Sequence, residues 1–503
     1  MAHRFVGLPE DHRKLYLYES DKDTKFRQVL WGDFLNVAGE DPDGWLRVTW
    51  APNSPAAREV FIPKADTVET RPLEVIFVDV GQGDGAVLIT PERDANERIV
   101  VIDAGERDNM RRFLDARFKA YRGFDFHAAV LTHPDSDHYR GFEPIFEDQD
   151  IGFDVVYQSG LVERPVSGTF EKVGGVHEDP ATGIAYVEDL ALGRAELETH
   201  FADPAPFGRR EFPPVMHAAL TNPRIHDFRI LSTGHGQLED GQSYMPGFAP
   251  SDQRGYTIEV VGPRMEFDAQ GNPRLRKIGD YGETKNGHSV LLKLVFGDFS
   301  ILFGGDLNHK AEKFILQDVA GLDTFPSQGT ADYNAMIAMA REIFRVDVMK
   351  VCHHGSEKVT DAFLETVNPA CFIISSGDQE GHVHPRPDLL GRLGRFGRGS
   401  APVLLSTELQ RSTRELEDLD EVAALSDDID ELATNPSTAL RDDVQAAVRR
   451  LARTNVDVYG AIYLKTDGKR LITAFKIEEP SPVKRWFYFE YALTAAGELE
   501  LVT

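Results

Sequence analysis

Short apolar runs alternate with polar turns along most of the chain, and the pattern is that of buried strands. Residues 291–296 form one such run, and the turn at 297–298 separates it from a second run at 299–303. Further runs occupy residues 128–131, 348–352 and 372–375. Apolar runs of about 4–8 residues bounded by turn residues predict buried strands. The sequence therefore predicts an α/β protein with a sheet-rich core.

The run at 128–131 leads into a dense group of polar side chains. His133, Asp135, Asp137 and His138 lie within six residues of one another. Imidazole nitrogens and carboxylate oxygens are ligands of Zn²⁺, Mn²⁺ and Fe²⁺, and carboxylates shift the preference toward Mn²⁺. A chance acidic turn with two surface histidines is the alternative interpretation. We favour a metal site because other strand ends carry similar residues.

Those other strand ends supply an aspartate and several histidines. The run at 299–303 ends in Gly304-Gly305-Asp306, and the run at 348–352 ends in His353-His354. The run at 372–375 leads on to His384. Loops that follow strands at one edge of a sheet can bring side chains together from distant parts of a sequence. We expect these groups to converge on the 133–138 loop.

The order of these motifs resembles the metallo-β-lactamase superfamily. The segment 133–138 is similar to its HxHxDH signature, with Asp135 where the second His usually stands. Within the superfamily the chain is most similar to the ComEC/Rec2-type hydrolase domain. Its segments DVGQGD at 79–84, VIDAG at 101–105, GD at 305–306 and HHGS at 353–356 follow that pattern in order. The resemblance covers roughly residues 72–390.

The resemblance implies an αββα sandwich that binds two divalent metal ions, Zn²⁺ or Mn²⁺. We favour His353 over His354 as the last ligand, because it is the first residue past its strand. Asp84 is expected near the site, behind the ligands. The implied ligands are His133 and Asp135 for the first ion, Asp137, His138 and His353 for the second, and Asp306 as the bridge between them.

The third superfamily motif departs from its usual form. A Gly-His-Thr is expected before the strand that precedes the bridging Asp, and this chain has Lys285-Asn286-Gly287-His288-Ser289. His288 could ligate at a shifted spacing, and Asn286 or no protein ligand are equal alternatives. With Asp135 in place of a His, the first site is richer in oxygen, which makes Mn²⁺ a serious candidate.

The expected chemistry is hydrolysis by water activated between two metals. Metals about 3.5–4 Å apart stabilise the attacking and leaving oxygens and lower the pKa of a bound water toward about 7. Asp137 is expected to orient the resulting hydroxide as well as to ligate. His384 could protonate a leaving group or bind phosphate. The candidate substrate-binding residues are His354, Asn286, His288, Arg386 and Arg392, the last two from an arginine-rich stretch that continues to Arg395 and Arg398.

Composition limits the choice of substrate and compartment. Lys and Arg total 55 against 82 Asp and Glu, a net charge of −27, so the surface as a whole repels nucleic acid. A small phosphodiester suits this charge better, although a local basic groove could still guide a single strand. The two cysteines form no disulfide framework, and no apolar run approaches the roughly 18–20 residues of a membrane span. We expect a cytoplasmic protein without the membrane channel of ComEC proteins.

The sequence predicts four regions. Residues 1–70 show short β-like runs, and Gly44-Trp45-Leu46-Arg47-Val48 is similar to a strand of bacterial SH3-like domains, which predicts a small barrel that could bind a protein or peptide. Residues 71–400 are the hydrolase, with an insertion within 143–282 that serves as a lid or wall over the pocket. Residues 401–456 are acidic and helical, and 457–503 form a C-terminal β region with an Asp467-Gly468 hairpin turn.

The leading function is metal-dependent cleavage of phosphodiester bonds, by a nuclease. Hydrolysis of a small ester or cyclic nucleotide is the alternative within enzymes, because one fold supports several chemistries. A binding module that acts through the SH3-like domain, with the hydrolase fold as scaffold, is the alternative outside enzymes. The nearly complete ligand set favours an enzyme.

Overall fold

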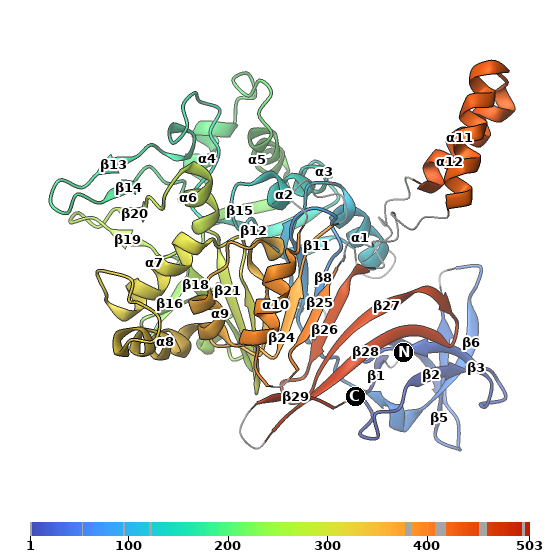
Figure 1. Ribbon diagram of the computed structural model, residues 1–503. Coiled ribbons are helices and arrows are strands. Elements are labelled where there is room, and N and C mark those ends of the chain that lie inside the picture. Colours follow the sequence, from blue (N-terminus) through green and yellow to red (C-terminus); the bar gives the residue numbers. More distant parts are fainter. Residues whose placement is uncertain are drawn as a thin grey trace.

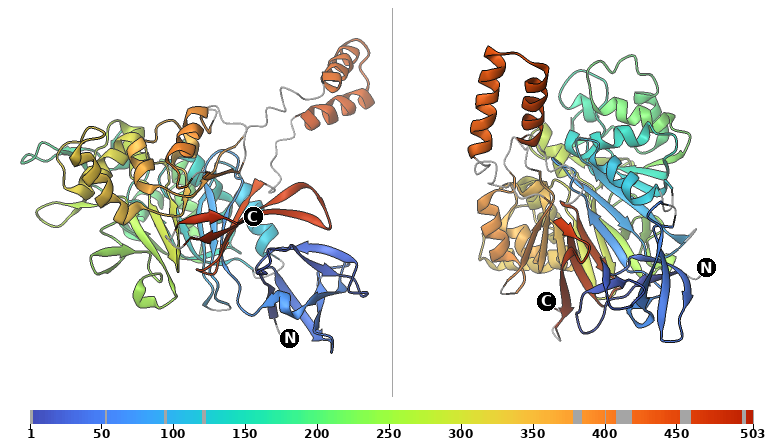
Figure 2. Two further views of the ribbon diagram at one scale, coloured as in Figure 1. Left: turned by 60° about the horizontal axis from the view of Figure 1, so that its bottom comes forward. Right: turned by 90° about the vertical axis from the view of Figure 1, so that its right-hand side faces the viewer.

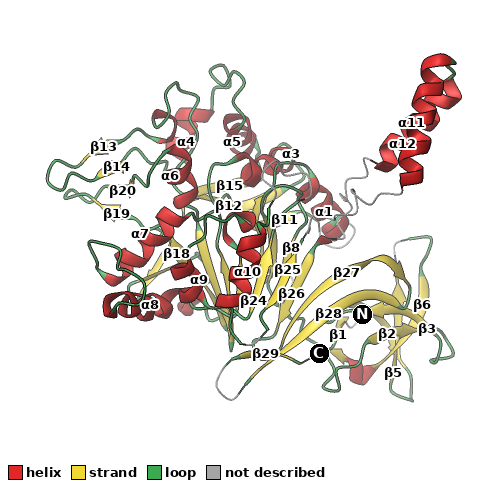
Figure 3. Ribbon diagram, in the orientation of Figure 1, coloured by secondary structure: helices red, strands yellow, loops and turns green. Residues whose placement is uncertain are grey.

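Two large β-sheets lie face to face at the centre of the molecule, and helices cover their outer faces (Figures 1 and 3). This computed structural model describes residues 3–52, 54–93, 96–119, 123–377, 384–399, 401–407, 419–451, 460–494 and 498–502 of the chain. The predicted α/β sandwich with helices outside is confirmed. The fold is mixed, because each large sheet contains both parallel and antiparallel strand pairs.

The first sheet has ten strands and carries the 133–138 loop. Its β10, β11, β12 and β15 are parallel neighbours, so their C-terminal ends share one edge. In spatial order the strands are β15 (Ile225–Ile230), β12 (Gly152–Gln158), β11 (Asp125–Val130), β10 (Ile99–Ala104), β9 (Gly85–Ile89), β8 (Leu73–Phe77), β26 (Ile462–Thr466), β27 (Leu471–Ser481), β28 (Lys484–Leu493) and β29 (Leu499–Leu501).

The second sheet has eight strands and carries Asp306 and the two adjacent histidines. β22, β23 and β24 are parallel, so the loops that follow them also leave from one edge. The order is β16 (Gln237–Glu239), β17 (Gln242–Tyr244), β18 (Tyr256–Gly262), β21 (Leu291–Phe296), β22 (Phe299–Phe303), β23 (Val348–Lys350), β24 (Cys371–Ile374) and β25 (Val403–Ser406). The strands predicted at 291–296 and 299–303 are confirmed.

Alternation of side chains along each strand creates one core between the sheets and two cores outside them. In β10, Val100 and Ile102 face the inner core and Val101 faces the outer one, because successive side chains of a strand point to opposite faces. On the first sheet the outer core lies under α1 (Asn109–Phe118), α3 (Glu143–Phe146), α4 (Arg194–Phe201) and α5 (Phe212–Thr221). On the second it lies under α7 (His309–Ala320), α8 (Ala331–Phe344), α9 (Asp361–Val367) and α10 (Pro387–Phe396).

The segment 143–282, within which the sequence predicts an insertion, contributes both to the core and to a separate lobe. Its β12, β15 and β18 belong to the two large sheets. The rest includes α4, α5 and a small four-stranded sheet, which stand beside the edge from which the 133–138 loop leaves (Figure 1). The small sheet consists of β13 (His177–Glu178), β14 (Ala185–Val187), β20 (Pro273–Arg276) and β19 (Glu266–Phe267).

A seven-stranded antiparallel sheet forms the N-terminal region, and its similarity to an SH3-like barrel stays a prediction. Trp31 is buried there, and Trp45 and Trp50 are partly buried. The spatial order is β3 (Lys25–Val29), β2 (Leu15–Tyr18), β6 (Arg58–Pro63), β5 (Trp45–Trp50), β4 (Phe34–Glu40), β1 (His3–Val6) and β7 (Thr67–Val68).

The C-terminal β region joins the core instead of standing apart from it. β26 pairs with β8, and the hairpin predicted at Asp467-Gly468 connects β26 to β27. The long β27–β28 hairpin reaches the N-terminal sheet (Figure 2), where the Gln28 side-chain oxygen accepts hydrogen bonds from the backbone N–H groups of Arg485 (2.7 Å) and Trp486 (3.0 Å). One sheet thus ties both ends of the described chain together.

Two helices, α11 (Leu419–Thr434) and α12 (Thr438–Leu451), project from the body (Figure 2). They cover much of the predicted acidic helical region, of which residues 408–418 and 452–459 lie outside the described residues. Within the described chain, no helix combines the length and the apolar character needed to cross a membrane.

The carboxyl group of Glu312 on α7 provides a test of the outer core. Burial raises its pKa to about 8. Because the folded state holds the proton more tightly than the unfolded state, stability should be full at low pH and fall as the pH rises from the unfolded pKa toward 8. We expect Glu312→Gln to remove up to about 5 kcal/mol of this loss. Urea unfolding of both proteins at about pH 5 and about pH 9 measures it; equal pH dependence in the two would contradict the prediction.

Candidate metal centre

The strand ends of both sheets bring four acidic and imidazole side chains together at one point. Asp84 immediately precedes β9, His138 lies in the short helix α2 (Ser136–Tyr139) after β11, Asp306 follows β22 and His354 follows β23. One potential ligand atom from each lies within 4.8 Å of the others, and all four residues are buried. This cluster could hold a metal ion, as the strand-end pattern predicted.

The ring nitrogens face the carboxylates at short range. The Nε2 atoms of His138 and His354 are 3.3 Å apart. Asp306 spans both, with Oδ1 at 3.2 Å from His138 Nε2 and Oδ2 at 3.2 Å from His354 Nε2. Asp137 Oδ2 lies 3.3 Å from His354 Nε2. Two imidazoles and two carboxylates therefore point at one small volume.

The outer nitrogen of each imidazole is already used. His138 Nδ1 lies 2.8 Å from Asp103 Oδ2, and Asp103 is held in turn by the backbone N–H (2.8 Å) and hydroxyl (2.7 Å) of Thr132. His354 Nδ1 lies 3.1 Å from Asp84 Oδ1 and 3.2 Å from the Ser375 carbonyl. When each ring is neutral and Nδ1 donates, Nε2 carries a lone pair that points at the carboxylates. In that state the donor set fits a cation.

The charge states of the cluster lead to the same requirement. Burial acts to lower the pKa of His138, but Asp306 and Asp103 outweigh it and hold that pKa well above its usual value. Burial acts to lower the pKa of His354 as well, and Asp306 and Asp84 outweigh it in the same way. The carboxylates thus make the site negative enough to retain protons on buried imidazoles. A divalent cation bound there would neutralise the same negative charge.

Backbone strain marks the same residues. Asp103, His353 and His354 have φ values of 54°, 52° and 52°. Left-handed φ values are uncommon for non-glycine residues and persist where the surroundings impose them, typically at functional sites. At 353–354 two such residues in succession turn the chain sharply after β23. The turn directs the second imidazole inward.

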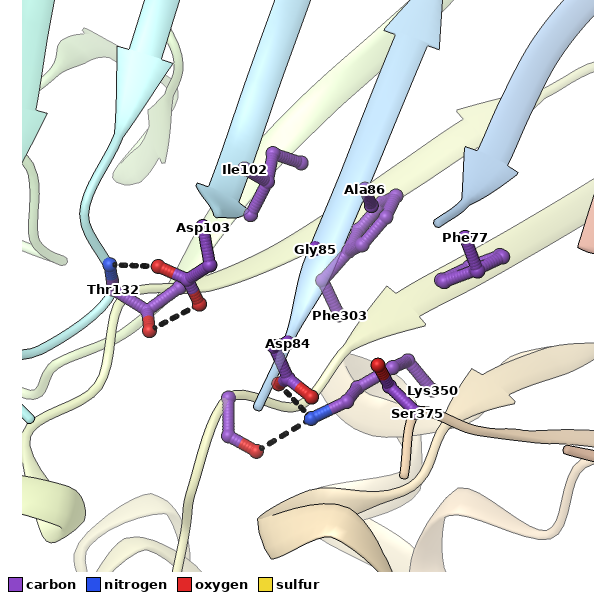
Figure 4. A pocket seen from close by; sticks show the side chains of 11 residues that line it. Phe77, Asp84, Gly85, Ala86, Ile102, Asp103, Thr132, Phe303, Lys350 and Ser375 are labelled. Carbon is purple, nitrogen blue, oxygen red and sulfur yellow. Dashed lines mark hydrogen bonds and ion pairs between the residues drawn. The ribbon is translucent and has the colours of Figure 1, made fainter. Parts of the chain in front are cut away.

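Beneath the cluster, Lys350 forms a buried ion pair with Asp84 and donates to the Gly305 carbonyl at 3.2 Å (Figure 4). Burial acts to lower the pKa of Lys350, but Asp84 and Asp306 outweigh it and raise the pKa. Its charge offsets one carboxylate at the floor of the site. Neither Lys350 nor Asp103 is among the site residues predicted from the sequence, although the lone lysine in the apolar run 348–352 is a signal for Lys350.

His133 and Asp135 adjoin the cluster, with the ring of His133 4.1 Å from that of His138. His133 Nε2 is 3.9 Å from Asp135 Oδ2 and 4.0 Å from Asp306 Oδ2. This nitrogen is buried and has no hydrogen-bond partner among the described residues, which fits a ligand atom. The carboxylate of Asp135 already has two partners, because Lys285 Nζ lies 2.8 Å from Oδ1 and the Asn286 amide can donate to Oδ2 at 2.9 Å.

The structure separates the histidines that the sequence left as alternatives. It brings His354 into the cluster, and His353 lies farther out, with Nε2 4.0 Å from Asp306 Oδ2. The sequence favoured His353 because it follows the strand directly, but the left-handed turn reverses that order. His288 lies 2.7 Å from the Arg276 carbonyl through Nε2, and Asn286 contacts the site only through Asp135. His384 lies at the rim, its ring 6.1 Å from that of His353.

The predicted arginine stretch is largely engaged elsewhere. Arg392 donates to Asp361 at 2.6 Å and to the Val359 carbonyl, and Arg398 is buried against Asp347 at 2.6 Å. Arg386 is half exposed and lies 3.2 Å from Glu357. Arg392 and Arg398 therefore fix the backbone around the second sheet, and Arg386 alone of these three keeps substantial exposure. His382, also in this stretch, lies outside the described residues.

Replacement of Asp103 tests how the cluster is oriented. In Asp103→Asn the amide can donate to His138 Nδ1, which moves the ring proton to Nε2 and blocks that ligand atom. We expect the affinity for Zn²⁺ or Mn²⁺ to fall by about 10–100-fold, measured by calorimetric titration of metal-free protein. Asp154→Asn, which changes an exposed carboxylate beside His127, is the matched control. Equal affinities in the two variants would refute the role of Asp103.

Comparison with known proteins finds a family match in the segment that contains the 133–138 loop. The family model of the metallo-β-lactamase superfamily matches residues 86–156, from β9 through the 133–138 loop into β12. No curated protein matches the chain. A crystal structure described as a metal-dependent hydrolase of the β-lactamase superfamily has 10% sequence identity and covers 67% of this chain and 96% of that chain. Its TM-score of 0.32 is too low to add to the assignment.

The family match and the site agree on one segment. The matched residues include His133, Asp135, Asp137 and His138, and the structure places their loop at the edge of a two-sheet sandwich beside Asp306. The superfamily match indicates a hydrolase, and the cluster shows where a metal could bind. The chain is thus similar to the metallo-β-lactamase superfamily over residues 86–156, the segment that carries the candidate metal loop.

Proposed function

We propose that this protein is a metal-dependent hydrolase of phosphodiester bonds and that its substrate is nucleic acid. The observation that carries the metal dependence is the convergence of His138 Nε2, His354 Nε2 and the Asp306 carboxylate within 3.3 Å of one another. The ComEC/Rec2-type motifs support the choice of phosphodiester bonds. A second divalent ion would lie on the His133 side of Asp306.

Six residues would hold the two ions. Asp137, His138 and His354 would hold one, His133 and Asp135 the other, and Asp306 lies between the two groups. Bound divalent ions supply Lewis-acid polarisation of the phosphoryl group and an activated water at neutral pH. His354 therefore takes the place that the sequence analysis gave to His353.

The protein's own groups hold this arrangement and manage protons. Asp103 keeps the proton of His138 on Nδ1. Lys285 forms an ion pair with Asp135, and Lys350 forms one with Asp84. These two ammonium groups reduce the repulsion among the carboxylates of the site. Asp137 is positioned to orient the attacking water as well as to ligate. His384, at the rim beside His353, is our candidate for protonating the leaving oxygen.

The net charge of −27 favours a second candidate, hydrolysis of a cyclic nucleotide or another small phosphodiester. A polynucleotide would require a local positive surface, because phosphate contacts dominate its affinity. Competitive assays of metal-loaded protein on single-stranded DNA, RNA and bis-p-nitrophenyl phosphate separate the two candidates. A protein that binds a peptide through the N-terminal sheet and cleaves none of these would instead be a binding module.

Asp306→Ala removes the carboxylate that lies between the two metal positions. We expect the metal content to fall toward one equivalent or less and hydrolysis to fall by about 100-fold or more. Elemental analysis and assays on bis-p-nitrophenyl phosphate measure the two effects. Asp306→Asn, which keeps the shape, and unfolding midpoints of both variants exclude misfolding as the cause. Undiminished turnover would rule out the dinuclear assignment.

Asp135 makes the first position rich in oxygen, so Mn²⁺ should support activity at least as well as Zn²⁺. In Asp135→His the preference should move toward Zn²⁺, because imidazole replaces the carboxylate. Titration of metal-free enzyme with each ion, with turnover as the readout, measures the ratio. A wild-type protein active with Zn²⁺ alone would contradict this prediction.

A further inference from the structure

A polar cavity of about 210 Å³ lies next to the metal loop, in the lobe formed by segment 143–282. A water molecule in the liquid takes about 30 Å³, so the cavity has room for a group of several heavy atoms. Apart from Pro213, the residues that line it are all polar or charged. They are Tyr139, Glu163, Arg164, Lys172, Arg210 and Glu211.

Two of the lining residues connect the cavity to the metal centre. Tyr139 directly follows His138, and its ring packs edge-on against Phe212 of α5 at 4.9 Å. Glu163 accepts from Lys285 Nζ at 2.8 Å, and the same ammonium group lies 2.8 Å from Asp135 Oδ1. One lysine side chain therefore links the wall of the cavity to a candidate metal ligand.

Three of the charged lining groups are balanced by neighbours. Glu163 pairs with Lys285, Arg164 forms an ion pair with Asp189, and Glu211 lies 3.4 Å from Arg140. Arg164 is buried, and its Nε atom has no hydrogen-bond partner among the described residues.

The remaining cations, Lys172 and Arg210, form no ion pair with the described residues. Arg210 is held by backbone carbonyls, with Nη1 donating to Pro206 and Phe207 and Nη2 to Val166, each at 3.2 Å. Carbonyl oxygens fix a guanidinium group without neutralising its charge. The cavity thus contains two cations that have no ion-pair partner among the described residues, in a chain whose net charge is −27.

We propose that this cavity binds a phosphate group of the substrate, next to the phosphodiester that is cleaved at the metals. Arg210 presents a planar fork that suits phosphate oxygens, and Lys172 adds a point charge. This site rests on the proposed function, which it deepens. It assigns the local positive surface that a polynucleotide requires to the 143–282 lobe, whereas the sequence analysis placed it in the Arg386–Arg398 stretch.

The test uses the double variant Lys172→Gln/Arg210→Gln. Its matched control is Lys119→Gln/Arg209→Gln, which removes the same charge from exposed residues that do not line the cavity. For a single-stranded oligonucleotide we expect the cavity variant to raise KM about 10-fold or more with little change in kcat, because charge-assisted hydrogen bonds are lost. The salt dependence should flatten. Turnover of bis-p-nitrophenyl phosphate, which reaches only the metals, should not change.

A binding measurement separates this site from the proposed function. Calorimetric titration of metal-free protein with inorganic phosphate should show binding that the cavity variant loses and the control retains. If wild-type protein cleaves no phosphodiester but this pattern holds, the proposed function fails and the phosphate site stands. If the cavity variant matches the control in both KM and phosphate binding, the site is overturned while the hydrolase assignment is untouched. Equal loss of activity on both substrates would also overturn it, since the residues would then support the metal loop.

Discussion

The arrangement of the candidate site depends on one electrostatic constraint, the convergence of His138 Nε2, His354 Nε2 and the carboxylate of Asp306 within 3.3 Å of one another. Asp103, Asp84 and the Ser375 carbonyl engage the opposite ring nitrogens, so both Nε2 atoms face inward. The buried carboxylates of such a set need positive charge nearby, either from protons on the imidazoles or from a bound cation. The buried lysines, the left-handed residues and the strand-end loops are all consistent with maintaining this geometry.

The two-sheet sandwich makes the convergence possible. Ligands come from both sheets, His138 from the first and Asp306 and His354 from the second, so the inner core that joins the sheets also sets the distances within the site. Lys350 occupies the seam, where its ammonium group joins Asp84 before β9 to the carbonyl of Gly305 after β22. The stability of the core and the geometry of the metal centre are therefore coupled through the same strands.

The lobe formed by part of 143–282 adjoins the candidate metal centre. The ion pairs from Glu163 to Lys285 and from Lys285 to Asp135 link its cavity to the metal loop. Lys285 lies in the segment 285–289, where the sequence departs from the third motif of the superfamily. Its ammonium group forms an ion pair with Asp135 and another with Glu163, so it connects the candidate metal loop to the neighbouring lobe.

The sequence by itself determined the strands at 291–296 and 299–303 and the candidate loop at 133–138, because these depend on local periodicity and on adjacent polar residues. The two-sheet sandwich followed from the resemblance of the motifs to the metallo-β-lactamase superfamily. It did not determine which of His353 and His354 faces inward, since that follows from a left-handed turn imposed by packing. Arg392 and Arg398, predicted near substrate, are engaged with Asp361 and Asp347. Asp103, Lys350 and the cavity at Lys172 and Arg210 are long-range arrangements, and only the tertiary structure decides which distant charges meet.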